Sequence, residues 1–288
     1  MTDSGGVEVD LDVIVVAEVP IPHAYVFRPE RRSRLAALLP PRGEAVRSPC
    51  LAYVVRHPAA GPILVDTGMH PDAASDLRRD FGIPMSLLFR HLRSAAEPFE
   101  EQLRGLGVEP LDVERVVMTH LHVDHTGGMR LLPRAEFVCS REEWAAANGR
   151  FAALNGYASH HLPDEARMRL LEFRQDGQPF GPFTKTLDLL GDGSVRLIST
   201  PGHTRGHLSV LLRLAGGRQA LLVGDAAYTQ RSIREEILPL FTKGDAAYLR
   251  SLREVKAFAE SEPDAPVVPT HDPTAWQELR DLAGATRS

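Results

Sequence analysis

Short apolar runs alternate with polar segments along the chain, and several of these runs end abruptly at a histidine or an aspartate. Runs with strand character lie at residues 7–19, 50–56, 62–65, 116–118, 136–139, 195–199, 208–214, 220–223 and 267–268. Segments with helical character lie at residues 97–106, 141–147 and 245–260. Strands mixed with helices predict an α/β protein, in which the polar residues at strand ends gather into a site.

The length and the lack of repeats favour one folding unit. A chain of 288 residues is long enough to bury a large hydrophobic core. It shows neither a repeat of fixed period nor a low-complexity linker. The sequence therefore predicts a single domain over residues 1–288, with its core at about 7–283.

The composition is that of an ordinary globular protein without a basic surface. Hydrophobic residues make up 43% of the chain, charged residues make up 25%, and the formal net charge is -5. Binding to nucleic-acid phosphates needs a basic face, so the charge argues against a nuclease. No apolar run reaches the length of a membrane span.

Cysteine usage and the amino terminus bear on the cellular compartment. Cys50 and Cys139 form one pair at most, and neither stands in a metal-ligand spacing. The amino terminus is acidic where a secretory signal would be basic. We therefore expect a reduced, cytoplasmic protein.

Four side chains that bind metals occur within six residues of each other after a short buried strand. His120 and His122 are two positions apart, so in an extended segment they point the same way and can hold one ion. Asp124 and His125 are adjacent and can serve a second ion only if the backbone turns there. The flexible residues 126–128 permit such a turn, and a helix is expected to follow. Imidazole and carboxylate donors predict zinc, with iron, manganese and cobalt as competitors.

Three further candidate ligands follow later strands. Together with the first four they provide ligands for two metal ions. The first metal is assigned three histidines: His120, His122 and His203. The second metal is assigned one aspartate and two histidines: Asp124, His125 and His271. Asp225 is assigned the bridge, because its two oxygens can hold ions roughly 3.5 to 4 Å apart.

Two polar residues near these ligands receive supporting roles. His207 lies on the far side of Gly206 and is interpreted as structural or as a support for a ligand. Asp66 ends another strand, and two interpretations stay open for it. It is either a turn residue or a carboxylate that orients a ligating histidine.

Several segments carry weaker signals. The pair His160-His161 lacks partners at ligand spacing and is interpreted as surface histidine. Residues 81–96 are apolar without a clear period, which indicates either core packing or a mobile apolar wall over the site. The basic stretch 28–39 indicates the solvated face of a short helix. Residues 148–185 give no clear prediction.

The combined motifs resemble those of the metallo-β-lactamase superfamily. They are His-x-His-x-Asp-His at 120–125, Thr-Pro-Gly-His-x-x-Gly-His at 200–207, an aspartate after a strand and a late histidine. Residues 61–69 and the sequence Asp225-Ala226-Ala227-Tyr228-Thr229 narrow the resemblance to the N-acyl homoserine lactone lactonases. It covers roughly residues 50–275 and implies an αβ/βα sandwich, two mixed sheets flanked by helices, with a dinuclear site at one edge. Thr270 departs from the pattern, because these lactonases often carry glycine before the late histidine.

The resemblance implies a quorum-quenching lactonase that opens the ring of an N-acyl homoserine lactone, with a metal-bridging hydroxide as the attacking group. It implies two divalent ions per chain and a small-molecule lactone as the partner, and it leaves a homodimer open. In these lactonases a tyrosine three positions after the bridging aspartate points at the substrate carbonyl, which assigns Tyr228 to the oxyanion. A neutral phenol is a hydrogen-bond donor at physiological pH. Asp124 is assigned the proton transfer to the leaving alkoxide.

Other activities share this ligand pattern. A thioesterase similar to glyoxalase II uses a similar dinuclear site, but no glutathione-binding extension is recognised and Tyr228 favours the lactone. A hydrolase of another lactone is a second alternative. A mononuclear iron persulfide dioxygenase would leave Asp124 and His125 without an ion, so the number of metal ions per chain separates it from the hydrolases. The seven candidate ligands argue against a metal-binding scaffold without catalysis.

Overall fold

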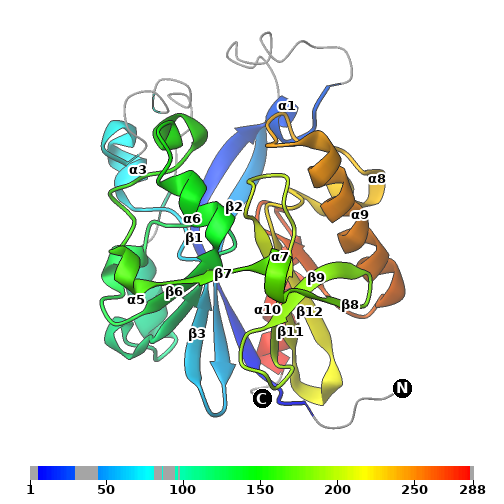
Figure 1. Ribbon diagram of the computed structural model, residues 1–288. Helices are drawn as coiled ribbons and strands as arrows, with labels where there is room; N and C mark the ends of the chain where they lie inside the picture. The colour runs from blue at the N-terminus through cyan, green and yellow to red at the C-terminus, as the bar shows by residue number, and fades with distance from the viewer. Residues whose placement is uncertain (1–5, 30–44, 81–85, 87–94, 97, 286–288) are drawn as a thin grey trace.

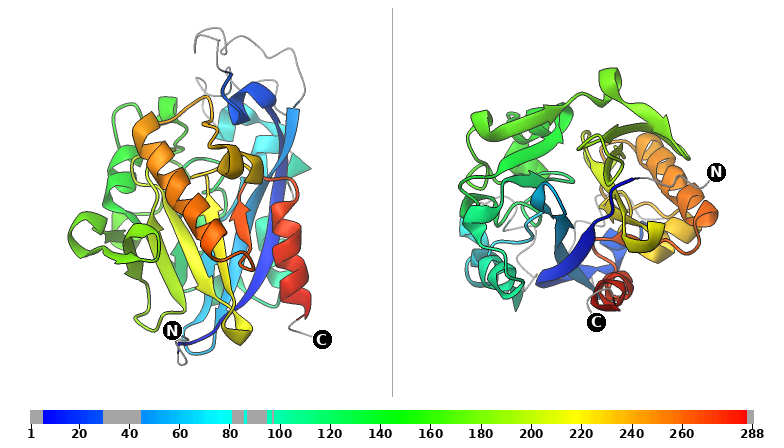
Figure 2. Two further views of the ribbon diagram at one scale, coloured as in Figure 1. Left: turned by 90° about the vertical axis from the view of Figure 1, so that its right-hand side faces the viewer. Right: turned by 90° about the horizontal axis from the view of Figure 1, so that it is seen from below.

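Two β-sheets pack face to face, and helices cover the outer face of each sheet (Figure 1). The computed structural model describes residues 6–29, 45–80, 86, 95–96 and 98–285. In the view from below in Figure 2, the sheets form the inner layers and the helices form the outer layers. This arrangement confirms the predicted αβ/βα sandwich.

The first sheet has seven strands in the order β4-β1-β2-β3-β5-β6-β7. These strands are β1 (Asp10–Pro22), β2 (Ala45–His57), β3 (Gly61–Val65), β4 (Ala95–Ala96), β5 (Arg115–Val117), β6 (Glu136–Ser140) and β7 (Met168–Leu171). The strands β2 and β3 are antiparallel, whereas β3, β5, β6 and β7 run parallel. Because parallel strands end at the same edge of a sheet, the residues after β3 and β5 lie close together.

The second sheet has six strands in the order β13-β12-β11-β10-β9-β8. These strands are β8 (Gln178–Phe180), β9 (Phe183–Asp188), β10 (Val195–Ser199), β11 (Leu208–Arg213), β12 (Gln219–Gly224) and β13 (Val267–Pro269). The strands β12 and β13 are the parallel pair of this sheet. Asp225 and His271 follow their ends, so the topology brings these two side chains to one edge.

Helices flank the two sheets. They are α1 (His23–Val26), α3 (Asp72–Ser75), α5 (Phe99–Gly105), α6 (Arg141–Ala147), α7 (Phe173–Asp176), α8 (Gln230–Glu235), α9 (Asp245–Ser261) and α10 (Ala275–Ala285). Apolar residues of α5 and α6 pack on the first sheet, and those of α9 pack on the second. Within the described ranges, no helix is long and apolar enough to cross a lipid bilayer.

Successive residues of the central strands face different parts of the core. On β12, Leu222 lies between the two sheets, whereas Leu221 lies under α9. On β3, Ile63 lies between the sheets and Leu64 packs against the helices outside. Side chains alternate along a strand, so a strand covered on both faces is a continuous apolar run. This explains why these strands are visible in the sequence.

The structure departs from the sequence predictions in several segments. The strand β5 ends at Val117, before the motif begins at His120, and only a short 3-10 helix, Met129–Leu131, follows the motif. The unpredicted region 148–185 contains β7, α7, β8 and part of β9. Most of the basic stretch 28–39 and most of residues 81–96 lie outside the described residues.

Candidate metal centre

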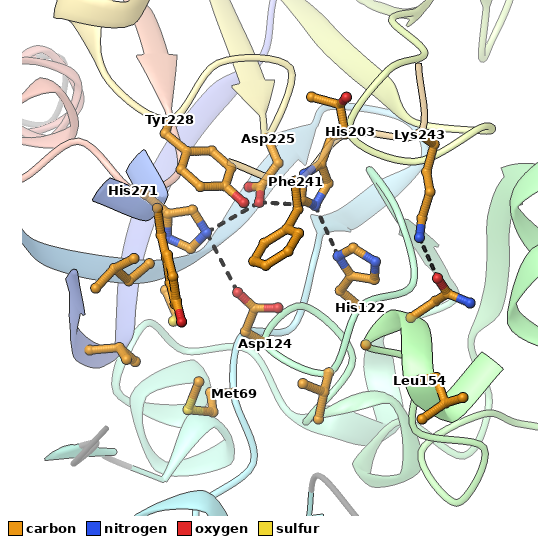
Figure 3. A pocket seen from close by; sticks show the side chains of 18 residues that line it. Met69, His122, Asp124, Leu154, His203, Asp225, Tyr228, Phe241, Lys243 and His271 are labelled. Atoms are coloured by element: carbon orange, nitrogen blue, oxygen red, sulfur yellow. Dashed lines mark hydrogen bonds and ion pairs between the residues drawn. The ribbon is translucent and has the colours of Figure 1, made fainter. Parts of the chain in front are cut away.

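All seven predicted ligands lie in loops that leave strands at one edge of the two sheets. They are His120, His122, Asp124 and His125 after β5, His203 after β10, Asp225 after β12 and His271 after β13. Figure 3 shows the side chains from both sheets turned toward one another around a central space. The fold therefore brings together residues that are up to 151 positions apart in the sequence, from His120 to His271.

The three histidines predicted for the first metal form one group. The ligand nitrogens of His120, His122 and His203 all lie within 4.8 Å of one another. The closest of these contacts joins His122 Nδ1 and His203 Nε2 at 2.9 Å. The two sheets thus meet at this group, since His122 comes from the first sheet and His203 from the second.

Asp225 lies between this group and the second one. Its Oδ2 is 3.3 Å from His203 Nε2 and 3.2 Å from His271 Nε2, and its Oδ1 is 3.4 Å from His125 Nε2. Asp124 closes the second group, with Oδ2 at 3.5 Å from His271 Nε2 and 3.8 Å from His125 Nε2. The carboxylate of Asp225 is therefore the one that reaches both groups, as a bridging ligand must.

The donor atoms of the cluster fit divalent metal ions. In the described part of the chain, five of these atoms are buried without a hydrogen-bond partner: His120 Nε2, His122 Nε2, His125 Nε2, His203 Nδ1 and Asp225 Oδ1. Buried polar atoms nearly always have partners, so a group of orphaned atoms indicates a missing one. Imidazole nitrogens and carboxylate oxygens are the donors that zinc and similar metals bind.

Hydrogen bonds behind the cluster fix the histidine rings. Asp66 accepts a hydrogen bond from the Thr119 backbone N–H and lies 2.8 Å from His125 Nδ1, which leaves His125 Nε2 to face Asp225. His271 Nδ1 donates to the backbone carbonyl of Pro49 at 3.0 Å. Such contacts set the tautomer and the direction of a metal-binding histidine. Of the two interpretations left open for Asp66, the orienting carboxylate is the one that the structure supports.

His207 uses both ring nitrogens inside the protein. Its Nδ1 is 2.9 Å from the hydroxyl of Thr200, and its Nε2 accepts from the backbone N–H of Asp225 at 2.9 Å. No ring nitrogen remains for a metal. The structural interpretation of His207 is confirmed, and its role is to hold the backbone of Asp225.

The pKa is lowered for His122 and raised for His125 and His271. Burial lowers the pKa of His122 to about 4, which keeps this ring in the neutral, metal-binding form. Burial would also lower the pKa of His125 and His271, but nearby carboxylates outweigh it and raise both values. The pKa of Asp225 is held well below its usual range, because His271, His203 and His125 overcome the effect of burial.

Metal uptake is expected to weaken as the pH falls from about 8 to about 6. A raised pKa means that His125 and His271 of the metal-free protein still hold protons at and above the ordinary histidine pKa. An ion must displace these protons, so its affinity rises with pH until both rings are neutral. Competition with a chromophoric chelator at several pH values measures this dependence, and an affinity that is constant over the range contradicts it.

Comparison with known proteins places the chain in a family. The family model for the metallo-beta-lactamase superfamily matches residues 45–271. The chain belongs to this superfamily. The N-acyl homoserine lactonase AttM of Agrobacterium fabrum is 33% identical over 230 residues, which are 79% of this chain and 83% of that protein.

Two solved structures share the superfamily fold with this chain. One is an N-acyl homoserine lactone hydrolase with the product N-hexanoyl-L-homoserine bound at its catalytic metal centre. It aligns with a TM-score of 0.72 and 23% identity over 95% of this chain and 96% of that chain. The other is AidC, a dizinc quorum-quenching lactonase with a TM-score of 0.63 and 16% identity, covering 93% and 89% of the two chains.

A cavity of about 310 Å³ opens onto the metal-binding edge of this superfamily member. Tyr228 lies at the cavity, with its ring 5.2 Å from that of His271 and 5.7 Å from that of His203 (Figure 3). Burial, followed by the charge of Asp225, raises the pKa of Tyr228 well above its ordinary value. The phenol is therefore a neutral hydrogen-bond donor beside the ligands.

Glu143 is a supporting residue that sequence reasoning missed. Its carboxylate accepts hydrogen bonds from the backbone N–H of Leu121 at 2.9 Å and of Gly206 at 3.2 Å, so it ties the two histidine loops together. Ser140 caps α6 by accepting from the Glu143 N–H, and the Ser-x-x-Glu spacing of a helix start is visible in the sequence. That signal predicts the cap but not the loops that the carboxylate reaches.

Two other expectations about single residues are corrected. Cys50 stands in no ligand spacing along the chain, yet the fold brings its Sγ within 4.8 Å of ligand atoms of Asp124 and His271. His161, interpreted as surface histidine, is only 3% exposed, whereas the side chain of its neighbour His160 is 52% exposed. Both errors have one origin, because sequence spacing cannot show contacts between distant segments.

Proposed function

We propose that this protein is a metal-dependent hydrolase that opens the lactone ring of N-acyl homoserine lactones to give the free hydroxy acid. The observation that carries the proposal is the position of Tyr228, a neutral phenol at the cavity beside a cluster of seven metal-binding side chains. The similarity to the lactonase AttM supports it. The metal donors suit a hydrolytic reaction, and the apolar wall of the cavity suits an acyl chain.

We propose two divalent ions, most simply zinc, as the cofactors. His120, His122 and His203 would hold one ion, Asp124, His125 and His271 the other, and Asp225 both. Ions in these places would polarise a carbonyl oxygen and lower the pKa of bound water. The contacts of Asp225 with both groups support two ions rather than the single iron of a persulfide dioxygenase.

Two side chains complete the chemistry at the ring ester. Tyr228 donates a hydrogen bond to the carbonyl oxygen, which becomes negatively charged as the ester is attacked. Asp124 is the more exposed carboxylate of the cluster, with 23% of its side chain exposed against 3% for Asp225. Asp124 would take the proton that the attacking water releases and pass it to the departing alkoxide.

The cavity offers an apolar surface for the acyl chain. Its apolar lining consists of Val19, Ile21, Tyr25, Met69, Val123, Leu154 and Phe241. Leu154 and Phe241 remain 59% and 43% exposed, although large apolar side chains are usually buried. We propose that both contact the acyl chain. The two interpretations of residues 81–96, core packing or an apolar wall over the site, fall mostly outside the described residues and stay predictions, as do the single domain and a cytoplasmic location, and a homodimer stays open.

Ring opening of acylated lactones is expected to exceed thioester cleavage by at least about 100-fold in kcat/KM, because the tyrosine and cavity suit the lactone. The measurement follows acid release by the zinc-loaded protein from short- and long-chain N-acyl homoserine lactones, a γ-alkyl lactone and a glutathione thioester. Chelator-treated protein is the control and should be inactive on every substrate. A preference for the thioester would overturn the lactone in favour of the glyoxalase II-like alternative.

A further inference from the structure

A buried chain of three polar side chains runs from Asp80 to the backbone of a metal-binding histidine. The side chains of Asp80, His161 and Thr126 belong to residues that are 1%, 3% and 0% exposed. His161 Nε2 is 2.6 Å from Asp80 Oδ1, and His161 Nδ1 is 2.9 Å from the hydroxyl of Thr126. Thr126 then donates to the carbonyl of His122 at 3.2 Å.

This chain ends at the turn that separates the two metal groups. The carbonyl of His122 also accepts from the backbone N–H of His125 at 3.0 Å, which closes the turn between them. The turn is what allows His122 to face His203 while His125 faces Asp225. A shift of this turn would therefore separate ligands of both groups at once.

The other side of the turn is fixed by the main chain and by the hydroxyl of Thr67, which donates to the His125 carbonyl at 2.8 Å. The Thr67 N–H donates to the carbonyl of His125, and the Gly127 N–H donates to that of Gly68. A side chain on Gly127 has no space, since its Cβ would lie 2.1 Å from the backbone nitrogen of His70. The main chain thus secures the His125 end, whereas the Thr126 hydroxyl adds a second bond at the His122 end.

The hydrogen-bond directions make the three side chains a unit. Thr126 has a single hydroxyl hydrogen, and the bond to the His122 carbonyl uses it. Both ring nitrogens of His161 are then donors, Nδ1 to the Thr126 oxygen and Nε2 to the carboxylate of Asp80. Asp80 therefore orients the ring of His161, and this ring orients the hydroxyl of Thr126. Carboxylates behind metal-binding histidines orient those rings in the same way.

We propose that Asp80, His161 and Thr126 are positioning residues that hold the His122–His125 turn in its metal-binding shape and thereby slow the loss of bound metal. The proposal rests on the metal centre proposed above, although it does not depend on the identity of the substrate. It assigns a role to a histidine that sequence spacing places on the surface.

The test compares two replacements of one residue in the zinc-loaded and cobalt-loaded protein. Thr126→Val keeps the shape of the side chain but removes the hydroxyl, whereas Thr126→Ser keeps the hydroxyl. Release of metal to excess chelator should be about 10- to 100-fold faster for Thr126→Val, the range found when groups behind metal ligands are removed. Thr126→Ser should release metal at nearly the wild-type rate. His161→Phe should resemble Thr126→Val, and the cobalt absorption spectrum should change in both.

Two control variants separate positioning from general loss of stability. Thr186 is a buried threonine, 1% exposed, whose hydroxyl donates to the carbonyl of Gln178 far from the ligands. Thr186→Val therefore removes a comparable hydrogen bond and should lower the melting temperature without changing metal release. His160→Gln changes the exposed neighbour of His161 and should leave both quantities unchanged. If Thr126→Val fails to fold, Asp80→Asn provides the same measurement with a smaller change.

Three outcomes would overturn the proposal. One is metal release from Thr126→Val and His161→Phe at the wild-type rate. Another is equal acceleration in Thr186→Val. The last is a third metal ion in the wild type that Asp80→Asn or His160→Gln removes, since donors of Asp80, His160 and His161 lie within 4.8 Å of one another. A wild-type protein that holds metal but opens no lactone would refute the proposed function alone and leave this inference intact.

Discussion

Asp225→Asn is expected to leave a folded protein that binds metal at least about 100-fold more weakly, the upper range for removing groups that merely orient a ligand. The carboxylate of Asp225 reaches three histidines at 3.2 to 3.4 Å and is the contact that both ligand groups share. The amide has no charge to offset the ions, and it offers one oxygen where the carboxylate offers two. Lactone opening should fall with the metal content.

The measurements are the number of metal ions per chain after dialysis and kcat/KM on the best lactone. Asp272→Asn is the matched control, because Asp272 is also buried, at 5% exposure, but accepts hydrogen bonds from the backbone of Gln230 and Ala275 instead of facing the ligands. This control should lose stability and keep its metal. If Asp225→Asn retains two ions and full activity, Asp225 is not the bridge.

The ligands themselves were predictable because metal binding constrains residue type and spacing within short segments. Three histidines and an aspartate between 120 and 125 are a local signal, and His203, Asp225 and His271 each follow a recognisable apolar strand. The adjacent residues Asp124 and His125 required the backbone to turn there, and the structure contains a turn that the His125 N–H closes onto the His122 carbonyl. His120 and His122 lie beyond the end of β5, and their ring nitrogens reach one group, as their spacing of two positions predicts.

The groups behind the ligands were not predictable, because their partners come from distant segments. Glu143 reaches Leu121 and Gly206 from the start of a helix, and His161 reaches Asp80 across 81 positions of the chain. Their side chains alone do not distinguish these residues from capping or surface residues. The short strand β8 was missed for a different reason. It is exposed along its length and lacks an apolar pattern.

The prediction of a lactone substrate depends on a weaker sequence signal than the prediction of the metal ligands. The ligand cluster suits several hydrolytic reactions, whereas the role proposed for Tyr228, a hydrogen-bond donor to the substrate oxygen that becomes charged, favours the lactone among them. Its neighbours keep it protonated, since burial and then Asp225 raise its pKa. The same environment makes a phenolate nucleophile or base unfavourable at Tyr228. The role proposed for Tyr228 is therefore that of a neutral hydrogen-bond donor.

Tyr228→Phe is accordingly expected to lower both kcat and kcat/KM for the lactone by about 100-fold, the range for loss of one oxyanion donor. The ring contacts with His271 and His203 persist in phenylalanine, so metal content should not change. Tyr53→Phe is the control, because it removes a buried hydroxyl that has no hydrogen-bond partner among the described residues and should leave turnover unchanged. An increase in KM with unchanged kcat would show that Tyr228 binds substrate and transition state equally. Unchanged kinetics would remove Tyr228 from the reaction, and the lactone would then rest on family similarity alone.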